Sequence, residues 1–87
     1  MIILRHHVFK RQWQKLPRGL QEKTEGRITL LMSDEFNERL NNHKLNPPYE
    51  SYRSINIAGD YRLVYKRIEK DAYYLRAVGT HHQLYGT

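Results

Sequence analysis

The order of hydrophobic and polar positions divides the chain into a helical first half and a strand-like second half. A short apolar run, residues 2–4, predicts a first strand. From Phe9 to Leu20 the hydrophobic residues recur at helical spacing, and Pro17 interrupts them. Because proline is tolerated at the start of a helix but not inside one, we expect one helix to end near Leu16. A second helix should run from Pro17 to about Met32.

A polar connection, residues 33–48, follows the second predicted helix, and we expect Phe36, Leu40 and Leu45 to pin it to the core. The period of the pattern then becomes strand-like. Three stretches rich in Tyr, Ile, Leu and Val predict strands at residues 52–57, 61–68 and 72–78. One strand, two helices and a three-strand meander, in the order β-α-α-β-β-β, predict an α+β fold.

The turn between the first two strands of the meander decides which side chains share a face. A two-residue turn centred on Ala58-Gly59, or one residue later, pairs odd positions before it with even positions after it. One face would then be a phosphate-binding surface, carrying Arg53, Ile55, Ile57, Asp60, Arg62, Val64 and Lys66. The other face would turn toward the helices, carrying Tyr61, Leu63 and Tyr65. Alternatively, Arg53 and Arg62 lie on a solvated face and pair with acidic side chains. A three-residue turn would instead place the two arginines on different faces.

Length and charge narrow the class of protein. The 87 residues form one domain, residues 1–87, with a formal net charge of +6. Residues 1–21 contain five basic and no acidic residues. Such a surface attracts polyanions, although a basic soluble protein without a nucleic-acid partner has the same composition. The chain lacks cysteine and any apolar run near the roughly 20 residues that span a bilayer, so we expect a cytoplasmic protein without membrane contact.

Two adjacent histidines, His81 and His82, directly follow the last predicted strand. Histidine moves protons near neutral pH, so either ring could serve in acid–base chemistry. A terminal histidine pair is, however, more often exposed and without a role. Zinc sites need three or four ligands at suitable spacing, which His6, His7 and His43 do not supply. We therefore expect no metal and no other cofactor.

Four segments in this order resemble the RelE/ParE superfamily of type II toxin–antitoxin toxins, and within it the YafQ-like branch. They are L-N-N-H-K-L at residues 40–45, Y-R-S-I-N-I at 52–57, D-Y-R-L-V-Y at 60–65, and G-T-H with L-Y-G at 79–86. The resemblance covers nearly the whole chain. It implies a small twisted antiparallel sheet with two N-terminal helices packed on one side. It also implies an endoribonuclease that cuts mRNA on the ribosome without a metal, and a cognate antitoxin that inhibits it.

In this family the RNA 2′-hydroxyl attacks the adjacent phosphate, and the resemblance assigns roles by position. His81 would be the general acid or base, and His43 a second proton-transfer or orienting group. Asp60 would orient a histidine, while Arg62 would stabilise the phosphorane. RNA contacts would come from Arg53, Lys44, Lys66 and Tyr85, with Tyr85 positioning or stacking a base.

The sequence departs from the family pattern at two places and leaves alternative functions open. Asn56 stands where many members of the branch carry a histidine, and Asn46-Pro47-Pro48 replaces a glycine. These departures leave open the division of proton-transfer roles and the codon preference. Two other functions also fit this fold, a ParE-like toxin that inhibits DNA gyrase without cutting RNA and a non-catalytic RNA-binding or antitoxin-binding protein.

Overall fold

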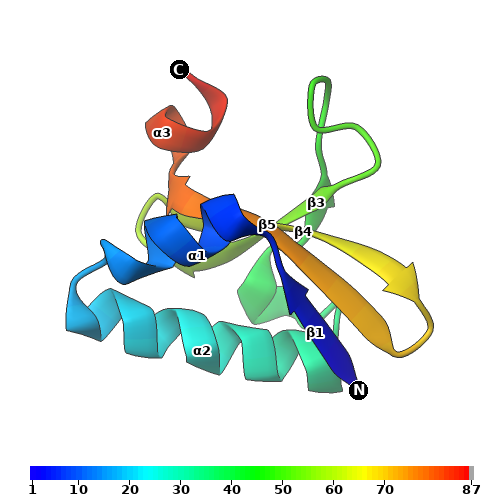
Figure 1. The fold of residues 1–87 in the computed structure, drawn as a ribbon. Coiled ribbons are helices and arrows are strands. Elements are labelled where there is room, and N and C mark those ends of the chain that lie inside the picture. The colour runs from blue at the N-terminus through cyan, green and yellow to red at the C-terminus, as the bar shows by residue number, and fades with distance from the viewer. Residues whose placement is uncertain (87) are drawn as a thin grey trace.

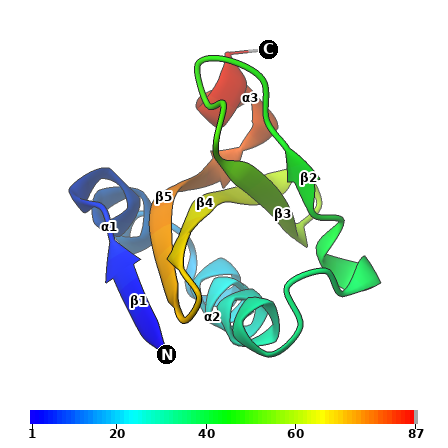
Figure 2. The ribbon, with the colours of Figure 1, turned by 90° about the vertical axis from the view of Figure 1, so that its right-hand side faces the viewer.

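Two helices cover one face of a curved sheet in the computed structural model, which describes residues 1–86 (Figure 1). A third, short helix stands at one end of the sheet, close to the loop that precedes β3 (Figure 2). The elements in chain order are β1 (Ile2–Arg5), α1 (His7–Gln14), α2 (Arg18–Ser33), the 3-10 helix η1 (Glu38–Leu40), β2 (His43–Lys44), β3 (Arg53–Ala58), β4 (Tyr61–Glu69), β5 (Ala72–Thr80) and α3 (His81–Tyr85).

The strands follow the order β1-β5-β4-β3-β2, so that β1 and β2 form the two edges. From β5 to β2 neighbouring strands are antiparallel, but β1 lies parallel to β5 and pairs Ile2 with Ala72 and Arg5 with Leu75. The α+β prediction is confirmed, while the sheet is mixed rather than wholly antiparallel. A parallel neighbour requires a crossover connection, and α1 and α2 lie in the segment that makes it. This connection places both helices on one face of the sheet.

The core lies between that face and the two helices, and Ile28 and Leu31 of α2 are buried in it. Leu40 is fully buried and pins the connection after α2. Leu45 also packs inward, but against the opposite face of the sheet. The prediction for Phe36 is wrong. Its ring is 65% exposed, because it lies outside the core beside the Arg53 guanidinium, whose carbon is 5.1 Å from the ring centre.

A bulge at the end of β3 reverses the predicted face of several side chains. The turn at Gly59-Asp60 pairs Ala58 with Tyr61, yet the next pair is Asn56 with Arg62, so Ile57 is an additional residue. Because side chains alternate between the two faces of a sheet, one extra residue moves the side chains on its far side to the opposite face. Arg53 therefore pairs with Tyr65 on the helix-covered face, whereas Arg62 lies on the open face. The prediction that these two arginines share a face is wrong.

The remaining members of the two predicted faces follow the same rule. Leu63 and Tyr65 face the helices as predicted, but Ile55 and Ile57 pack with them rather than on the face of Arg62. Val64 lies on the open face in a second apolar cluster with Ala77 and Leu84, joined by Leu45, Tyr49, Tyr52 and Tyr85. This second cluster fastens α3 and the loop of residues 45–52 to one end of the open face. It thereby provides the support for the site.

Helix α3 begins with a capping box that sets its direction. The Thr80 hydroxyl accepts the Gln83 N–H at 3.1 Å, and the Gln83 side-chain oxygen accepts the Thr80 N–H at 2.9 Å. The helix ends at Tyr85 and is capped by Gly86, whose φ of +75° is a left-handed conformation that glycine adopts without steric cost. The sequence pattern had not predicted this helix, because five residues are too few to show a helical period.

Candidate active site

Arg62 is held at the centre of the open face by hydrogen bonds to neutral acceptors. Its Nε donates to the Ser54 hydroxyl, and its Nη2 donates to the carbonyl oxygens of Asn41 at 2.9 Å and Ser54 at 3.0 Å. Burial lowers the pKa of the Arg62 guanidinium, and the neighbouring Tyr85 opposes part of this effect. Among residues 1–86 no carboxylate forms an ion pair with Arg62. A fixed, half-buried cation without a counter-ion is suited to an anionic substrate group.

His43 lies directly beside Arg62 at the edge strand β2. Its Nδ1 is 3.1 Å from the Asn41 carbonyl oxygen and 3.4 Å from Arg62 Nη2. A carbonyl only accepts and a guanidinium only donates, so the tautomer decides which contact is a hydrogen bond. The shorter contact favours a hydrogen on Nδ1. The exposed Nε2 then carries the lone pair and is the nitrogen available to take a proton.

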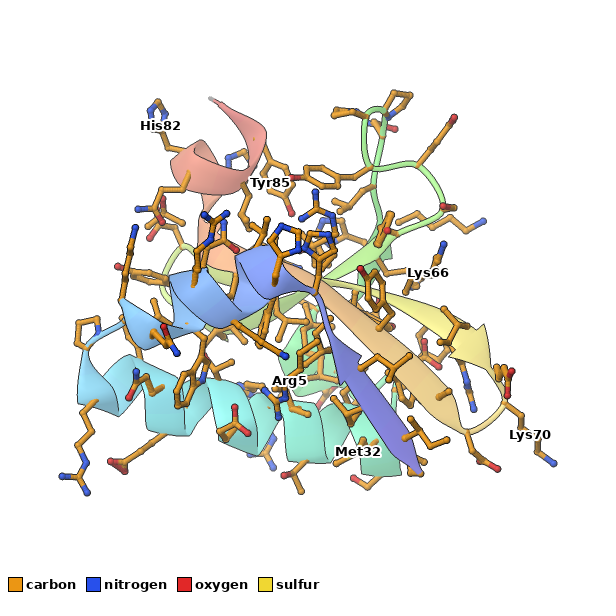
Figure 3. The ribbon with its side chains drawn as sticks, in the orientation of Figure 1. Arg5, Met32, Lys66, Lys70, His82 and Tyr85 are labelled. Atoms are coloured by element: carbon orange, nitrogen blue, oxygen red, sulfur yellow. The ribbon has the colours of Figure 1, made fainter. Side chains whose placement is uncertain are left out.

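His81 and Tyr85 come from α3 and meet edge to face, with ring centres 4.6 Å apart. The backbone N–H of His81 donates to the Asp60 carbonyl oxygen at 3.0 Å, which ties the start of α3 to the turn before β4. The Tyr85 hydroxyl is buried and has no hydrogen-bond partner among the described residues. It approaches Arg62 without reaching hydrogen-bond geometry. His82 projects from α3 into solvent, away from Tyr85 (Figure 3).

A cleft of about 410 Å³ brings four of the predicted residues together, namely His43, Lys44, His81 and Tyr85. The loop after β2 and helix α3 form its walls, and His43, His81 and Tyr85 line it together with Lys44, Leu45, Asn46, Pro47, Pro48, Tyr49 and Leu84. The Asn46-Pro47-Pro48 segment, which departs from the family pattern, is therefore a wall of the cleft. Two groups able to move protons thus share a space with an aromatic ring, and one of them contacts Arg62.

The other predicted residues, Arg53, Asp60 and Lys66, lie around this cleft rather than in it. Asp60 meets His81 through its backbone oxygen, while its side chain is exposed in the turn. Lys44 and Arg53 form a cross-strand pair, and with Lys66 they line a neighbouring groove of about 390 Å³. Lys66 also lies over the Tyr52 ring at 5.1 Å. Arg53 and Lys66 thus reach one groove at the sheet edge from opposite faces. Arg67 lines the same groove and was not predicted from sequence.

Three more residues contribute to the site without having been assigned a role from sequence. The backbone carbonyl oxygens of Asn41 and Ser54 hold Arg62. Every residue has such a carbonyl, so the sequence could not show which ones would accept these hydrogen bonds. Asn41 adopts a left-handed φ of 46°, which asparagine tolerates better than most residues, so its type was a weak signal. Asn56 is cross-strand from Arg62, and its buried Oδ1 has no partner among residues 1–86.

Among the described residues, 1–86, no three side chains of the His, Cys, Asp and Glu types are grouped so that they could hold a metal ion. None of the helices in this range combines the length and apolar character needed to cross a membrane.

Comparison with solved structures shows which class of protein has this fold. The crystal structure of YafQ from E. coli BL21(DE3) has a TM-score of 0.82 at 20% identity, with 97% of each chain covered. The toxin of the E. coli DinJ–YafQ complex has a TM-score of 0.79 at 20% identity, covering 97% of this chain and 96% of its own. The YoeB–YefM complex from Staphylococcus aureus gives a TM-score of 0.78 at 15% identity, covering 93% and 97%. The fold is that of toxins from type II toxin–antitoxin systems.

The sequence profile described as "Bacterial toxin of type II toxin-antitoxin system, YafQ" matches residues 2–86. The chain belongs to this family, within the RelE/YafQ branch of type II toxins. A search of curated proteins found no match. The resemblance of the four short segments is thereby confirmed.

Proposed function

We propose that this toxin is an mRNA endonuclease that acts on the ribosome and cuts RNA by internal attack of a 2′-hydroxyl. The observation that carries the proposal is the arrangement of His43, His81 and Tyr85 around one cleft, with His43 against Arg62. An attacking hydroxyl must lose a proton, a leaving oxygen must gain one, and the phosphorane carries additional negative charge. This part of the molecule holds one candidate for each requirement.

In the proposed reaction one histidine takes the proton of the 2′-hydroxyl as its oxygen bonds to phosphorus. The bond from phosphorus to the 5′-oxygen breaks, and the second histidine protonates that oxygen. His81 and His43 share these two roles, and Arg62 stabilises the charge on the phosphate oxygens. The products are a 2′,3′-cyclic phosphate and a free 5′-hydroxyl. Asp60 positions His81 through the backbone bond at the start of α3.

RNA binding would use the cleft and the basic groove beside it. Tyr85 would stack on or position a base, since an aromatic face accepts any nucleobase. Lys44 lines both the cleft and the groove, and Arg53 and Lys66 would hold phosphates that flank the cut. A nuclease that works on translating ribosomes acts in the cytoplasm. None of these steps requires a metal or an organic cofactor.

A cognate antitoxin is the proposed protein partner. The related toxins of E. coli and Staphylococcus aureus were solved in complex with DinJ and YefM. The net charge of +6 favours an acidic partner segment, and such a segment would block catalysis by covering the cleft or displacing α3.

The test is cleavage of an mRNA on purified ribosomes, mapped by primer extension, with the wild type and with His81→Ala, His43→Ala and His82→Ala. We expect cuts in phase with codons from the wild type and from His82→Ala, because His82 projects away from the cleft. The other two variants should lose at least about 100-fold in rate. Inhibition of DNA gyrase supercoiling by a wild type that leaves mRNA intact would instead support the ParE-like function.

A further inference from the structure

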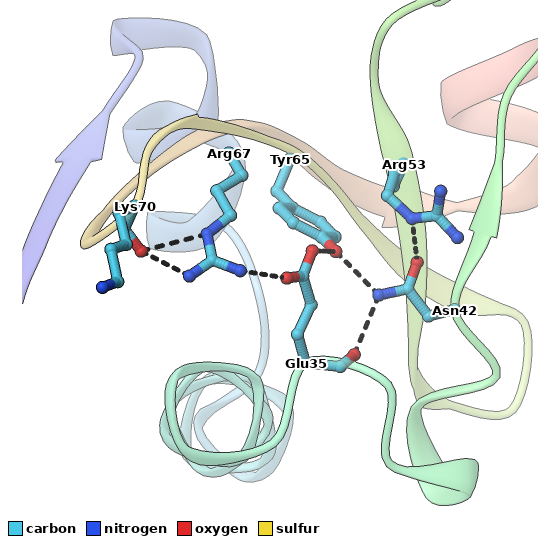
Figure 4. Close-up of polar contacts among 6 residues, drawn as sticks. All are labelled: Glu35, Asn42, Arg53, Tyr65, Arg67 and Lys70. Atoms are coloured by element: carbon cyan, nitrogen blue, oxygen red, sulfur yellow. Dashed lines mark hydrogen bonds and ion pairs between the residues drawn. The ribbon is translucent and has the colours of Figure 1, made fainter.

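A second polar network lies on the helix-covered face of the sheet, behind the cleft (Figure 4). The Tyr65 hydroxyl donates to Glu35 Oε2 at 2.6 Å and accepts from Asn42 Nδ2 at 2.7 Å. Arg67 Nη1 donates to Glu35 Oε1 at 2.8 Å, while its Nε donates to the Lys70 carbonyl at 3.1 Å. The network joins the segment after α2 to the middle of β4.

Asn42 is held in a single orientation by this network. Its Nδ2 donates to the Glu35 carbonyl at 2.9 Å as well as to Tyr65, and its Oδ1 accepts from Arg53 Nε at 2.7 Å. Both amide hydrogens and the amide oxygen are therefore engaged. Tyr65 is fully buried. Burial, together with the bond to Glu35, raises the pKa of Tyr65, so its hydroxyl stays protonated and continues to donate.

On one side of Asn42, His43 lines the cleft, and on the other side Asn41 contacts both His43 and Arg62. The Asn41 carbonyl accepts from Arg62 Nη2 at 2.9 Å and lies 3.1 Å from His43 Nδ1. Asn41 itself is in the left-handed region, at φ 46°, a conformation that the surrounding structure must maintain. Any rotation of the Asn42 side chain or backbone would therefore move the one carbonyl that both catalytic candidates share.

We propose that Tyr65 and Asn42 are positioning residues that act through the Asn41 carbonyl to keep His43 with its hydrogen on Nδ1 and its lone pair on Nε2. The expected effect on cleavage rests on the proposed nuclease function, but the tautomer of His43 can be measured without any RNA. A rigid support behind a catalytic group matters because a displacement of about 1 Å can cost about 100-fold in rate. The buried face of the sheet thus sets the chemistry of the open face.

The experiment compares Tyr65→Phe with Tyr73→Phe, which removes a hydroxyl from the neighbouring core ring. The two ring centres are 5.9 Å apart, and among residues 1–86 the Tyr73 hydroxyl bonds to no part of the network. Long-range ¹H–¹⁵N spectra at about pH 8, where imidazole is neutral, report the tautomer. A His43→Gln sample assigns the signals. We expect the wild type and Tyr73→Phe to show hydrogen on Nδ1, and Tyr65→Phe to show a mixture.

Cleavage on ribosomes provides the second measurement. Tyr65→Phe should lower kcat about tenfold or more and leave KM within about twofold, since the cleft surface is unchanged. An unaltered tautomer and an unaltered kcat in Tyr65→Phe would overturn the inference while leaving the nuclease function intact. A shifted tautomer in a protein whose wild type cuts no RNA would support the positioning and overturn the function.

A second pair of variants keeps the inference testable if Tyr65→Phe does not fold. Glu35→Gln retains an oxygen that can accept from the Tyr65 hydroxyl, whereas Glu35→Leu removes it. Both variants lose the ion pair with Arg67, so the pair controls for charge. We expect Glu35→Gln to keep the Nδ1–H tautomer and Glu35→Leu to lose it. Equal spectra from the two variants would contradict the proposed role of the network.

Discussion

Replacement of Tyr85 by phenylalanine should make the protein more stable and less active. The Tyr85 hydroxyl is buried without a hydrogen-bond partner among residues 1–86, while the ring packs against Tyr49 and His81. An unsatisfied buried polar group costs about 1–3 kcal/mol, because it gave up its bonds to water. The nearby Arg62 guanidinium offsets part of this cost. We therefore expect Tyr85→Phe to gain about 1 kcal/mol in the free energy of unfolding.

We expect substrate binding to bring a phosphate against both Arg62 and this hydroxyl, which is buried in the unbound protein. A hydrogen bond to a charged group contributes about 1.5–3 kcal/mol, and each 1.4 kcal/mol corresponds to about tenfold in rate. Loss of the hydroxyl should therefore lower kcat by about 10-fold to 100-fold. The phenyl ring keeps the stacking surface, so KM should change less than kcat. A gain in stability with a loss in activity is typical of groups that a site holds unsatisfied until substrate binds.

Thermal unfolding followed by circular dichroism measures the first effect, and ribosome-dependent cleavage measures the second. A gain of about 1 kcal/mol raises Tm by about 4–8 °C in a domain of this size. Tyr74→Phe is the control, because Tyr74 is half-buried on β5 outside the cleft. A lowered Tm in Tyr85→Phe would contradict the prediction, since it would mean that the hydroxyl has a stabilising partner. An unchanged kcat would exclude contact between the hydroxyl and the substrate.

Three further predictions concern α3, α1 and Arg62. In Gly79→Ala the new Cβ would lie 2.8 Å from the Gln83 Oε1 that caps α3. The free energy of unfolding should therefore fall by about 1 kcal/mol, seen as a lower Tm, and RNA cleavage should weaken. An unchanged Tm would show that the cap adapts to the added methyl group. Partial burial, with Arg76, His7 and Arg11 nearby, lowers the pKa of His6, whose neutral Nδ1 caps α1 by accepting the Val8 N–H. His6 therefore takes up a proton more readily in the unfolded chain than in the folded protein. The Tm of the wild type should fall as pH falls below 6.5, and the Tm of His6→Asn should fall less. The lysine of Arg62→Lys cannot reproduce the three directed hydrogen bonds that the guanidinium donates. This variant should cleave RNA at least about 100-fold more slowly. Full activity would show that the guanidinium geometry is not needed for cleavage.

Local periodicity was enough to predict the two main helices and the three long strands. Helical spacing around Pro17 placed the boundary between α1 and α2, and the three strand-like stretches correspond to β3, β4 and β5. The residues of the cleft were also predictable, since His43, His81 and Tyr85 belong to short segments that identify the family. The helices and strands could be predicted because side-chain type and spacing carry them directly, whereas the cleft residues were predicted from the resemblance to the family.

The register of those elements and the contacts that support them depend on tertiary interactions, which local residue patterns do not encode. Whether Arg53 and Arg62 share a face depends on one additional residue in the β3–β4 ladder, and a bulge leaves no reliable mark in the residue pattern. The parallel pairing of β1 and the edge strand β2 arise from long-range backbone bonds, which any residue can make. The Asn41 carbonyl that joins His43 to Arg62 is likewise a main-chain group. We propose that it contributes to the site because Asn42 and Tyr65 hold it in place from the other face of the sheet.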